Sequence, residues 1–231
     1  MDIIQLVPTR DINLQSICNE DYHHPYEKPI YYAVVKRLSD IILSGTALIL
    51  LAPFFLLVIL LIRRDGGAAI YSQERLRRYG KPFKCYKFRS MILGADDILK
   101  DNKVLWEKYV ANGNKLPPGE DPRITKIGKL LRQTSLDELP QLWNIFRGDM
   151  ALVGPRPILP FEIHEYAGRE QILFSMRPGL TGWWQVNGRS KILYPERGNL
   201  QCDYIFFANI RWDIKIILMT VRSVLLAKDA W

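Results

Sequence analysis

Residues 41–62 read IILSGTALILLAPFFLLVILLI, a run of 22 residues without a charge. A run of this length and apolarity is typical of a helix inside a lipid bilayer rather than of a helix in a protein core. Pro53 lies near the middle of the run, where its ring removes one backbone hydrogen bond and clashes with the preceding turn. We therefore expect a helix that is kinked near Ala52 and Pro53.

Basic residues flank this run on both sides, with Lys36 and Arg37 before it and Arg63 and Arg64 after it. The positive-inside rule consequently gives no preferred direction of crossing. At about 1.5 Å per residue, the arms on either side of the proline would be roughly 18 and 14 Å long, each about half of a ~30 Å hydrocarbon core. Two interpretations stay open: a re-entrant helix with both ends in the cytoplasm, which the symmetric charge favours, and a kinked helix that spans the bilayer.

The composition of the whole chain is that of a folded, basic protein. It has 231 residues, 48% of them hydrophobic, and a net charge of +8, which excludes a disordered or collagen-like chain. Such a charge favours anionic partners such as nucleic acid, anionic lipid or phosphorylated small molecules. The basic residues are scattered among predicted loops without a nucleic-acid-binding motif, so we expect no nucleic-acid partner. Cys18, Cys85 and Cys202 form no CxxC pair, which argues against a zinc ribbon.

The regions on either side of the apolar run differ in character. Residues 1–30 show no sustained apolar period and are interpreted as a polar N-terminal tail. After the run, the β-prone stretches 68–76 and 81–91 are separated by RRYGKP (77–82), which contains turn-forming glycine and proline. This pattern predicts a β-hairpin.

The rest of the chain has mostly helical patterns. Residues 92–111 are predicted to form a helix, and residues 124–146 to form two helical segments that meet near Ser135. Near the C-terminus, apolar residues recur at helical spacing, which fits either a buried core face or a helix on the membrane surface. The core face is the favoured interpretation. The residues of this stripe are Ile214, Ile217, Leu218, Val221 and Leu225.

The segment LRQTSLDELPQ (131–141) carries two adjacent acids, Asp137 and Glu138. Ser135 followed by Glu138 fits a capping box, and Pro140 fits the first turn of a helix. The acids are therefore predicted at a helix N-terminus, where free amides and the helix dipole attract carboxylates and bound phosphate alike. Acids that merely cap a helix would give the same pattern, so that alternative stays open. An acidic pair can also hold Mg²⁺ together with substrate phosphates, and a carboxylate can act as a nucleophile.

Arginines next to glycine or proline follow in RGDMALVGPRP (147–157) and RPGLTGWWQVNGR (177–189). Guanidinium groups suit bidentate contacts to phosphate, and glycine lets the backbone approach a ligand closely. We therefore expect a phosphorylated ligand, most naturally a diphosphate. Trp183 and Trp184 fit the protein core or the bilayer interface better than stacking on a base. The arginines concerned are Arg147, Arg156, Arg177 and Arg189, with Arg132 upstream of the acidic pair.

These motifs together resemble the bacterial sugar transferase family, the monotopic polyprenyl-phosphate sugar-1-phosphate transferases. The resemblance covers residues 31–231 and rests above all on DPRITKIGKLLRQTSLDELPQLWNIFRGDMALVGPRP (121–157). Within the family, the chain resembles the small form, which lacks the helical bundle and the extra soluble domain of larger members. It also resembles the type that initiates exopolysaccharide or capsule synthesis. Shorter motifs that add to it are KRLSD (36–40), DGGAAIYSQER (65–75), FKCYKFRSM (83–91), RPGLTGWWQVNGR (177–189) and RWDIKIILMT (211–220).

The resemblance implies a helix-rich α+β fold and a monotopic membrane protein. Residues 31–64 would form a re-entrant membrane helix broken at Pro53. Residues 65–231 would form a catalytic domain that lies on the cytoplasmic face of the bacterial inner membrane and contains a small β-hairpin and interfacial amphipathic helices. Membrane lipids, and a second copy of the chain in a homo-oligomer, are compatible partners.

The reaction implied is transfer of a sugar 1-phosphate from a UDP-sugar to undecaprenyl phosphate, a polyprenyl phosphate, with release of UMP. The resemblance makes Asp137 the nucleophile that forms a covalent aspartyl-phosphosugar intermediate, and Glu138, with Asp137, the ligand of Mg²⁺. The residues of these motifs favour galactose or glucose as the sugar of the donor. Open alternatives are a UDP-linked N-acetylated amino sugar as donor and a non-catalytic, membrane-tethered basic module for polysaccharide-assembly partners; residues 104–121 have no predicted role. The other expected phosphate- and substrate-binding residues are Lys87, Arg132, Arg156, Arg177 and Arg189.

Overall fold

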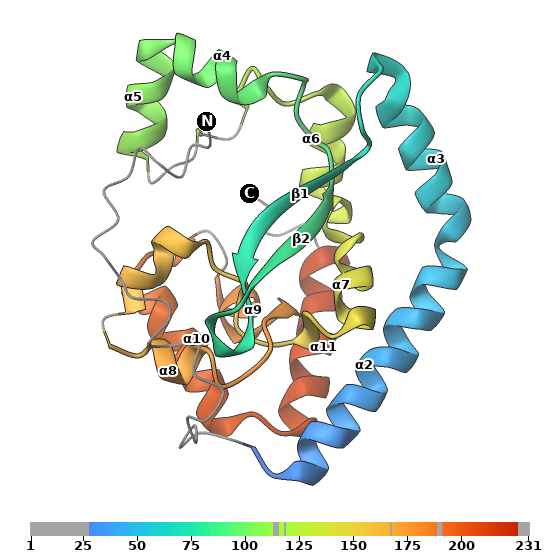
Figure 1. Ribbon diagram of the computed structural model, residues 1–231, viewed down its shortest axis with the longest axis vertical. Coiled ribbons are helices and arrows are strands. Elements are labelled where there is room, and N and C mark those ends of the chain that lie inside the picture. Colours follow the sequence, from blue (N-terminus) through green and yellow to red (C-terminus); the bar gives the residue numbers. More distant parts are fainter. Residues whose placement is uncertain (1–27, 113–115, 118, 167, 189–190, 226–231) are drawn as a thin grey trace.

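Helices dominate the fold, and two separate two-stranded sheets complete it (Figure 1). This arrangement agrees with the predicted helix-rich α+β class. The computed structural model describes residues 28–112, 116–117, 119–166, 168–188 and 191–225, so most of the predicted tail lies outside the described residues. The helices that follow the apolar run are α4 (Ala95–Asp101), α5 (Lys103–Ala111), α6 (Lys126–Gln133), α7 (Gln141–Arg147), α8 (Glu170–Leu173), α9 (Trp183–Asn187), α10 (Glu196–Phe207) and α11 (Ile210–Leu225).

The apolar run lies in two helices, α2 (Ile30–Leu50) and α3 (Ala52–Ile62), which meet at Leu51 with a bend of 61°. Pro53 lies in the first turn of α3. The predicted kink is therefore confirmed, because a proline nitrogen cannot continue the hydrogen bonding of α2. No single described helix is long and apolar enough to cross a membrane, whereas the bent pair passes that test as one unit.

The bent pair runs along one side of the molecule (Figure 1). Many of its large apolar side chains are exposed on the protein surface. In a water-soluble protein a surface of this kind would be costly, so it marks an interaction with lipid or with another apolar surface. The exposed side chains include Val34, Leu38, Ile42, Ile49, Leu56 and Leu60.

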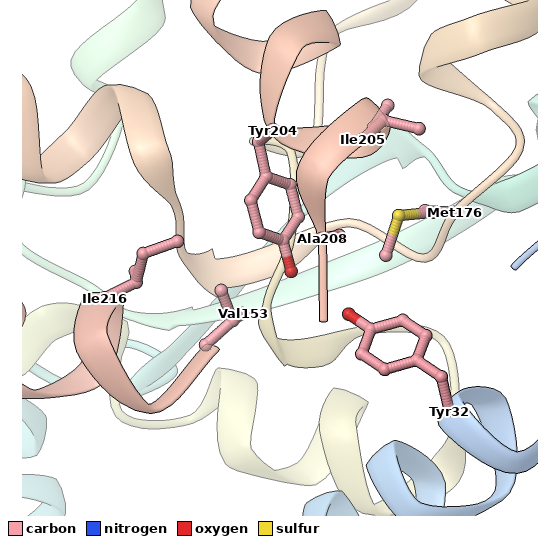
Figure 2. Close-up of a cluster of buried hydrophobic side chains, with 7 residues drawn as sticks. All are labelled: Tyr32, Val153, Met176, Tyr204, Ile205, Ala208 and Ile216. Atoms are coloured by element: carbon pink, nitrogen blue, oxygen red, sulfur yellow. The ribbon is translucent and has the colours of Figure 1, made fainter. Parts of the chain in front are cut away.

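Helix α2 is tied to the rest of the protein through the buried carboxylate of Asp213 on α11. This carboxylate accepts hydrogen bonds from the hydroxyls of Tyr32 (3.0 Å) and Tyr204 (2.6 Å) and pairs with the Lys36 Nζ at 2.7 Å. Figure 2 shows the two tyrosine hydroxyls turned toward each other, one from α2 and one from α10. A buried charge with three partners fixes the register of three helices, because a shift of any one would leave it uncompensated.

The predicted β-hairpin is confirmed. Strands β1 (Ile70–Leu76) and β2 (Pro82–Phe88) pair antiparallel. The outer edge of β2 is covered by Asn144 of α7, whose side chain donates to the Lys84 carbonyl (2.7 Å) and accepts from the Tyr86 backbone N–H (3.1 Å). One fully buried amide thus replaces a third strand and holds the hairpin against α7.

A second, parallel sheet pairs β3 (Ala151–Val153) with β4 (Gly179–Thr181). Strands of three residues are too short to leave a readable pattern in the sequence, and this sheet was not predicted. A Cβ added at Gly179 would come within 2.0 Å of the Gly154 backbone nitrogen. The glycines of the two arginine-rich segments are therefore required for close backbone packing, which places Arg156 beside β4.

The prediction of one helix over residues 92–111 is wrong. The structure divides this region into α4 and α5 at Asn102, whose backbone is extended. The Asn102 side chain accepts a hydrogen bond from the Leu105 backbone N–H at 3.0 Å. Asparagine favours this local contact over helix continuation, so it ends one helix and caps the next.

The favoured core placement of the C-terminal apolar stripe is wrong for three of its residues, whereas Ile217 is partly buried and packs against the core. Ile214, Leu218 and Val221 are each more than half exposed, whereas Asp213 and Ile216 face the core. The reason is the buried polar network around Asp213, which sets the rotation of α11 and turns the stripe outward. Helix α11 is consequently amphipathic, with an apolar face that no described residue covers.

Candidate active site

The two acids of the central motif lie in a short 3-10 turn, η4 (Leu136–Glu138), between α6 and α7. The predicted capping box does not form: Ser135 has a left-handed backbone (φ +57°) and its side chain makes no cap hydrogen bond. Pro140 is the residue that precedes α7. The acids thus lie before an α-helix rather than in its first turn, because the left-handed residue turns the chain sharply between the helices.

The two carboxyl groups of this turn ionise in different environments. Asp137 is 9% exposed, and burial, followed by the charge of Glu138, raises its pKa to about 6 against the opposing charge of Lys87. Burial alone would also raise the pKa of Glu138, but the charge of Lys87 and its hydrogen bond at 2.6 Å hold that pKa below its ordinary value. Glu138 is therefore a fixed anion, and Asp137 is a destabilised one.

A cleft opens beside this turn. It brings together three of the residues that the sequence analysis selected, Lys87, Glu138 and Arg156, from β2, the acidic turn and the segment after β3. A fourth, Arg132, lies on the other side of the acids, where its Nε donates to the Ser90 hydroxyl at 2.8 Å and its charge acts on Asp137. The cleft is thus a cationic hollow beside the acidic turn, and Glu138 is the acid of the pair that lines it.

Arg75 of β1 also lines the cleft, and the sequence analysis missed it. It is only 8% exposed, and it donates to the Pro157 carbonyl (3.1 Å) and to the Gln73 side-chain oxygen (2.9 Å). Burial, followed by the charge of Arg156, lowers the pKa of Arg75 to about 10. In the hairpin register Gln73 faces Cys85 and Tyr71 faces Lys87, so Arg75 and Lys87 share one face. Only the register of β1 against β2 puts the two residues on one face, and no pattern within either strand indicates it.

Arg177 does not line the cleft. The charges that lower the pKa of Arg177, after burial itself, are those of Arg37 and Arg78, so Arg177 lies toward α2 and the hairpin turn. Arg189 lies outside the described residues. Arg147 is half exposed and is 3.8 Å from Asp149.

The family described as "Bacterial sugar transferase" matches residues 31–227 of this chain. The chain belongs to this family. The matched range includes the bent helix pair, the hairpin and every residue of the cleft.

Several curated relatives are similar to this chain over most of its length. A "UDP-galactose-lipid carrier transferase" of Erwinia amylovora is 42% identical over 202 residues, and an "Undecaprenyl-phosphate galactose phosphotransferase" of Salmonella typhimurium is 40% identical over 204 residues; each match covers 85% of this chain. The chain spans only 42% of the length of each of these two relatives. An "Exopolysaccharide production protein ExoY" of Sinorhizobium fredii is 38% identical, with 86% of this chain and 88% of the relative covered.

The acid pair fits a Mg²⁺ ion that takes some of its ligands from the phosphates of a substrate. Among the described residues, no three His, Cys, Asp or Glu side chains come together in a metal-binding group. Mg²⁺ is usually held by one or two carboxylates with phosphate oxygens and water as the other ligands. Because the charge of Glu138 raises the pKa of Asp137, a cation between the two carboxylates would relieve their repulsion.

The raised pKa of Asp137 predicts that this residue costs stability. Below about pH 4 the carboxyl is protonated in both folded and unfolded protein; above pH 6 it is ionised in both, and the burial penalty is complete. Asp137→Asn should therefore raise the free energy of unfolding at pH 8 by about 1–3 kcal/mol, with a gain that shrinks toward pH 5. Thermal unfolding of the detergent-solubilised protein at several pH values measures this. Asp203→Asn, at an exposed acid of α10, is the control, and an equal gain in both variants would contradict the prediction.

Proposed function

We propose that this protein transfers a sugar 1-phosphate from a UDP-sugar to undecaprenyl phosphate and releases UMP. The observation that carries the proposal is the acidic turn with the cleft beside it: in a bacterial sugar transferase, a desolvated aspartate adjoins a glutamate–lysine pair that lines a cleft together with Arg75 and Arg156. The names of the two relatives from Erwinia amylovora and Salmonella typhimurium support the lipid carrier and the type of group transferred. Their galactose specificity, shared by both names, makes UDP-galactose the first donor to test, ahead of UDP-glucose.

In the first step a carboxylate oxygen of Asp137 attacks the β-phosphorus of the donor. The bond from this phosphorus to the oxygen that bridges the two phosphates breaks, and its electron pair leaves with UMP. In the second step a phosphate oxygen of undecaprenyl phosphate attacks the same phosphorus. The bond to Asp137 then breaks, which regenerates the carboxylate and yields the lipid diphosphate sugar. No proton is gained or lost overall, so the protein needs charge neutralisation and alignment more than acid–base groups.

The side chains of the cleft suit these needs. Burial strips water from the Asp137 carboxylate, and its pKa of about 6 still leaves it ionised at neutral pH. Lys87 keeps Glu138 charged and fixed at 2.6 Å, while Arg75 and Arg156 place positive charge where phosphate oxygens would lie. Mg²⁺ held by Glu138 and Asp137 would add Lewis-acid charge at the phosphate oxygens.

We also propose that α2 and α3 form a re-entrant helix and that residues 65–231 lie on the cytoplasmic face of the bacterial inner membrane. The 61° bend, the basic flanks at both ends and the exposed apolar side chains of the pair support this. Exposed apolar side chains on α7 and α11 extend the same kind of surface beyond the pair. They include Trp143, Phe146, Ile214, Leu218 and Val221. A domain held flat in this way would reach the phosphate of a lipid without leaving the membrane surface.

Release of UMP tests the reaction directly. Detergent-solubilised full-length protein with Mg²⁺ and undecaprenyl phosphate should release UMP continuously from UDP-galactose, whereas UDP-N-acetylglucosamine should give little. Asp137→Asn should abolish release, because the oxygen that attacks phosphorus is gone, and the exposed-acid variant Asp203→Asn should retain it. Release of UDP would indicate ordinary glycosyl transfer instead. Folded protein that releases no UMP across a panel of UDP-sugars would favour the membrane-tethered basic module.

Cysteine labelling tests the topology. Tyr31 and Arg64 are exposed at the two ends of the bent pair, and the native Cys85 and Cys202 are buried. In a Cys18→Ser background, Tyr31→Cys and Arg64→Cys should both react with an impermeant thiol reagent from the cytoplasmic side only. Ile49→Cys, near the bend, should react from neither side. Labelling of Tyr31→Cys from the periplasm would show that the pair spans the membrane.

A further inference from the structure

A cluster of cationic side chains surrounds one buried indole next to the cleft. Trp184, in the first turn of α9, is 5% exposed. The guanidinium carbons of Arg197 and Arg156 lie 4.1 and 5.6 Å from the centroid of its ring. Each contact is favourable by itself, but two guanidinium groups around one ring repel each other. Burial, followed by the charge of Arg156, lowers the pKa of Arg197 against the opposing charge of Glu162.

The polar atoms of this cluster are buried without partners. Within the described part of the chain, no hydrogen-bond acceptor reaches the Nε of Arg156, the Nε and Nη2 of Arg197, or the Nε1 of Trp184. All four are N–H donors. Buried donors are nearly always paired in folded proteins, and unpaired ones are costly. A group of unpaired donors with excess positive charge therefore indicates a missing ligand that is anionic and carries several acceptor oxygens, as a phosphate does.

The cluster is continuous with the cleft of the acid pair. Arg156 contributes to both, because its charge acts on Glu138 and Arg75 on one side and on Arg197 on the other. Its backbone N–H donates to the Gln201 side chain at 2.7 Å, one helical turn from Arg197 on α10. Arg156, which lines the cleft, is thus the residue through which a ligand there would reach the Trp184 cluster.

We propose that Arg156, Arg197 and the indole N–H of Trp184 bind the phosphate that leaves with the nucleotide. The inference rests on the proposed function: with the β-phosphorus next to Asp137, the adjoining α-phosphate lies on the Arg156 side. Negative charge develops on this phosphate as the bond between the two phosphates breaks, and fixed donors stabilise it there. The role differs from that of Lys87 and Arg75, which face the phosphate that is transferred.

Binding of UMP and of uridine to the full-length protein in detergent tests this without turnover. The two ligands differ only in the phosphate, so calorimetric titration with each isolates its contribution. Wild-type protein should bind UMP at least tenfold more tightly than uridine. Arg197→Gln and Trp184→Phe should each weaken UMP binding by about tenfold and leave uridine binding unchanged. Trp184→Phe is the gentler change, since it keeps an aromatic ring for the guanidinium groups and removes the N–H, so it carries the test if Arg197→Gln does not fold.

Arg169→Gln is the matched control, because Arg169 is an exposed cation that contacts α10 through Asn199. It should change neither affinity. An unchanged ratio of UMP to uridine affinity in folded Trp184→Phe and Arg197→Gln would overturn the inference. Wild-type protein that releases UMP from a UDP-sugar but binds UMP no better than uridine would also overturn it and would leave the proposed function standing. Absence of UMP release would remove both.

Discussion

The ion pair between Lys87 and Glu138, at 2.6 Å, is the contact on which the site depends. It joins β2 to the acidic turn, and it holds Glu138 as an anion while the neighbouring Asp137 is left buried with a raised pKa. Two adjacent carboxyl groups thereby receive two different roles. The hairpin that supplies Lys87 is in turn held by Asn144 of α7, so the residues that follow the acids in the sequence also fix the cation that faces them.

The acidic turn and its surroundings concentrate groups that reduce stability in the absence of a ligand. Burial raises the pKa of Asp137 and lowers the pKa of Arg75, Arg132 and Arg197, so each of these groups is desolvated more than its partners compensate. A fold selected for stability alone would replace such groups with apolar ones. Their presence in and near the cleft and the acidic turn is the physical sign of a site built for a ligand that supplies negative charge and, with it, a cation. In the proposed function, the bent helix pair would solve a separate problem, because it would bring this hollow to a lipid substrate.

Local patterns predicted much of this fold, and long-range contacts decided the rest. The bend at Pro53, the hairpin and the cationic surroundings of Glu138 followed from the apolar run, the turn residues and the motif positions. The capping box failed because Glu138 found a partner 51 residues away in Lys87. The face of α11 was misjudged because Asp213, a single acid among apolar residues, is paired inside the core. Arg75 was missed because only the register of β1 against β2 places it on the same face as Lys87.

The most direct test of the account is a search for the covalent intermediate. Full-length protein mixed with UDP-galactose and Mg²⁺, without undecaprenyl phosphate, is analysed by intact-protein and peptide mass spectrometry after acid quenching. The account predicts one equivalent of UMP and a protein that is heavier by one hexose phosphate, carried on the peptide that contains Asp137 and removed when undecaprenyl phosphate is added. UMP release that needs the lipid from the start, with no adduct at any time, would contradict it and indicate direct transfer between the two substrates.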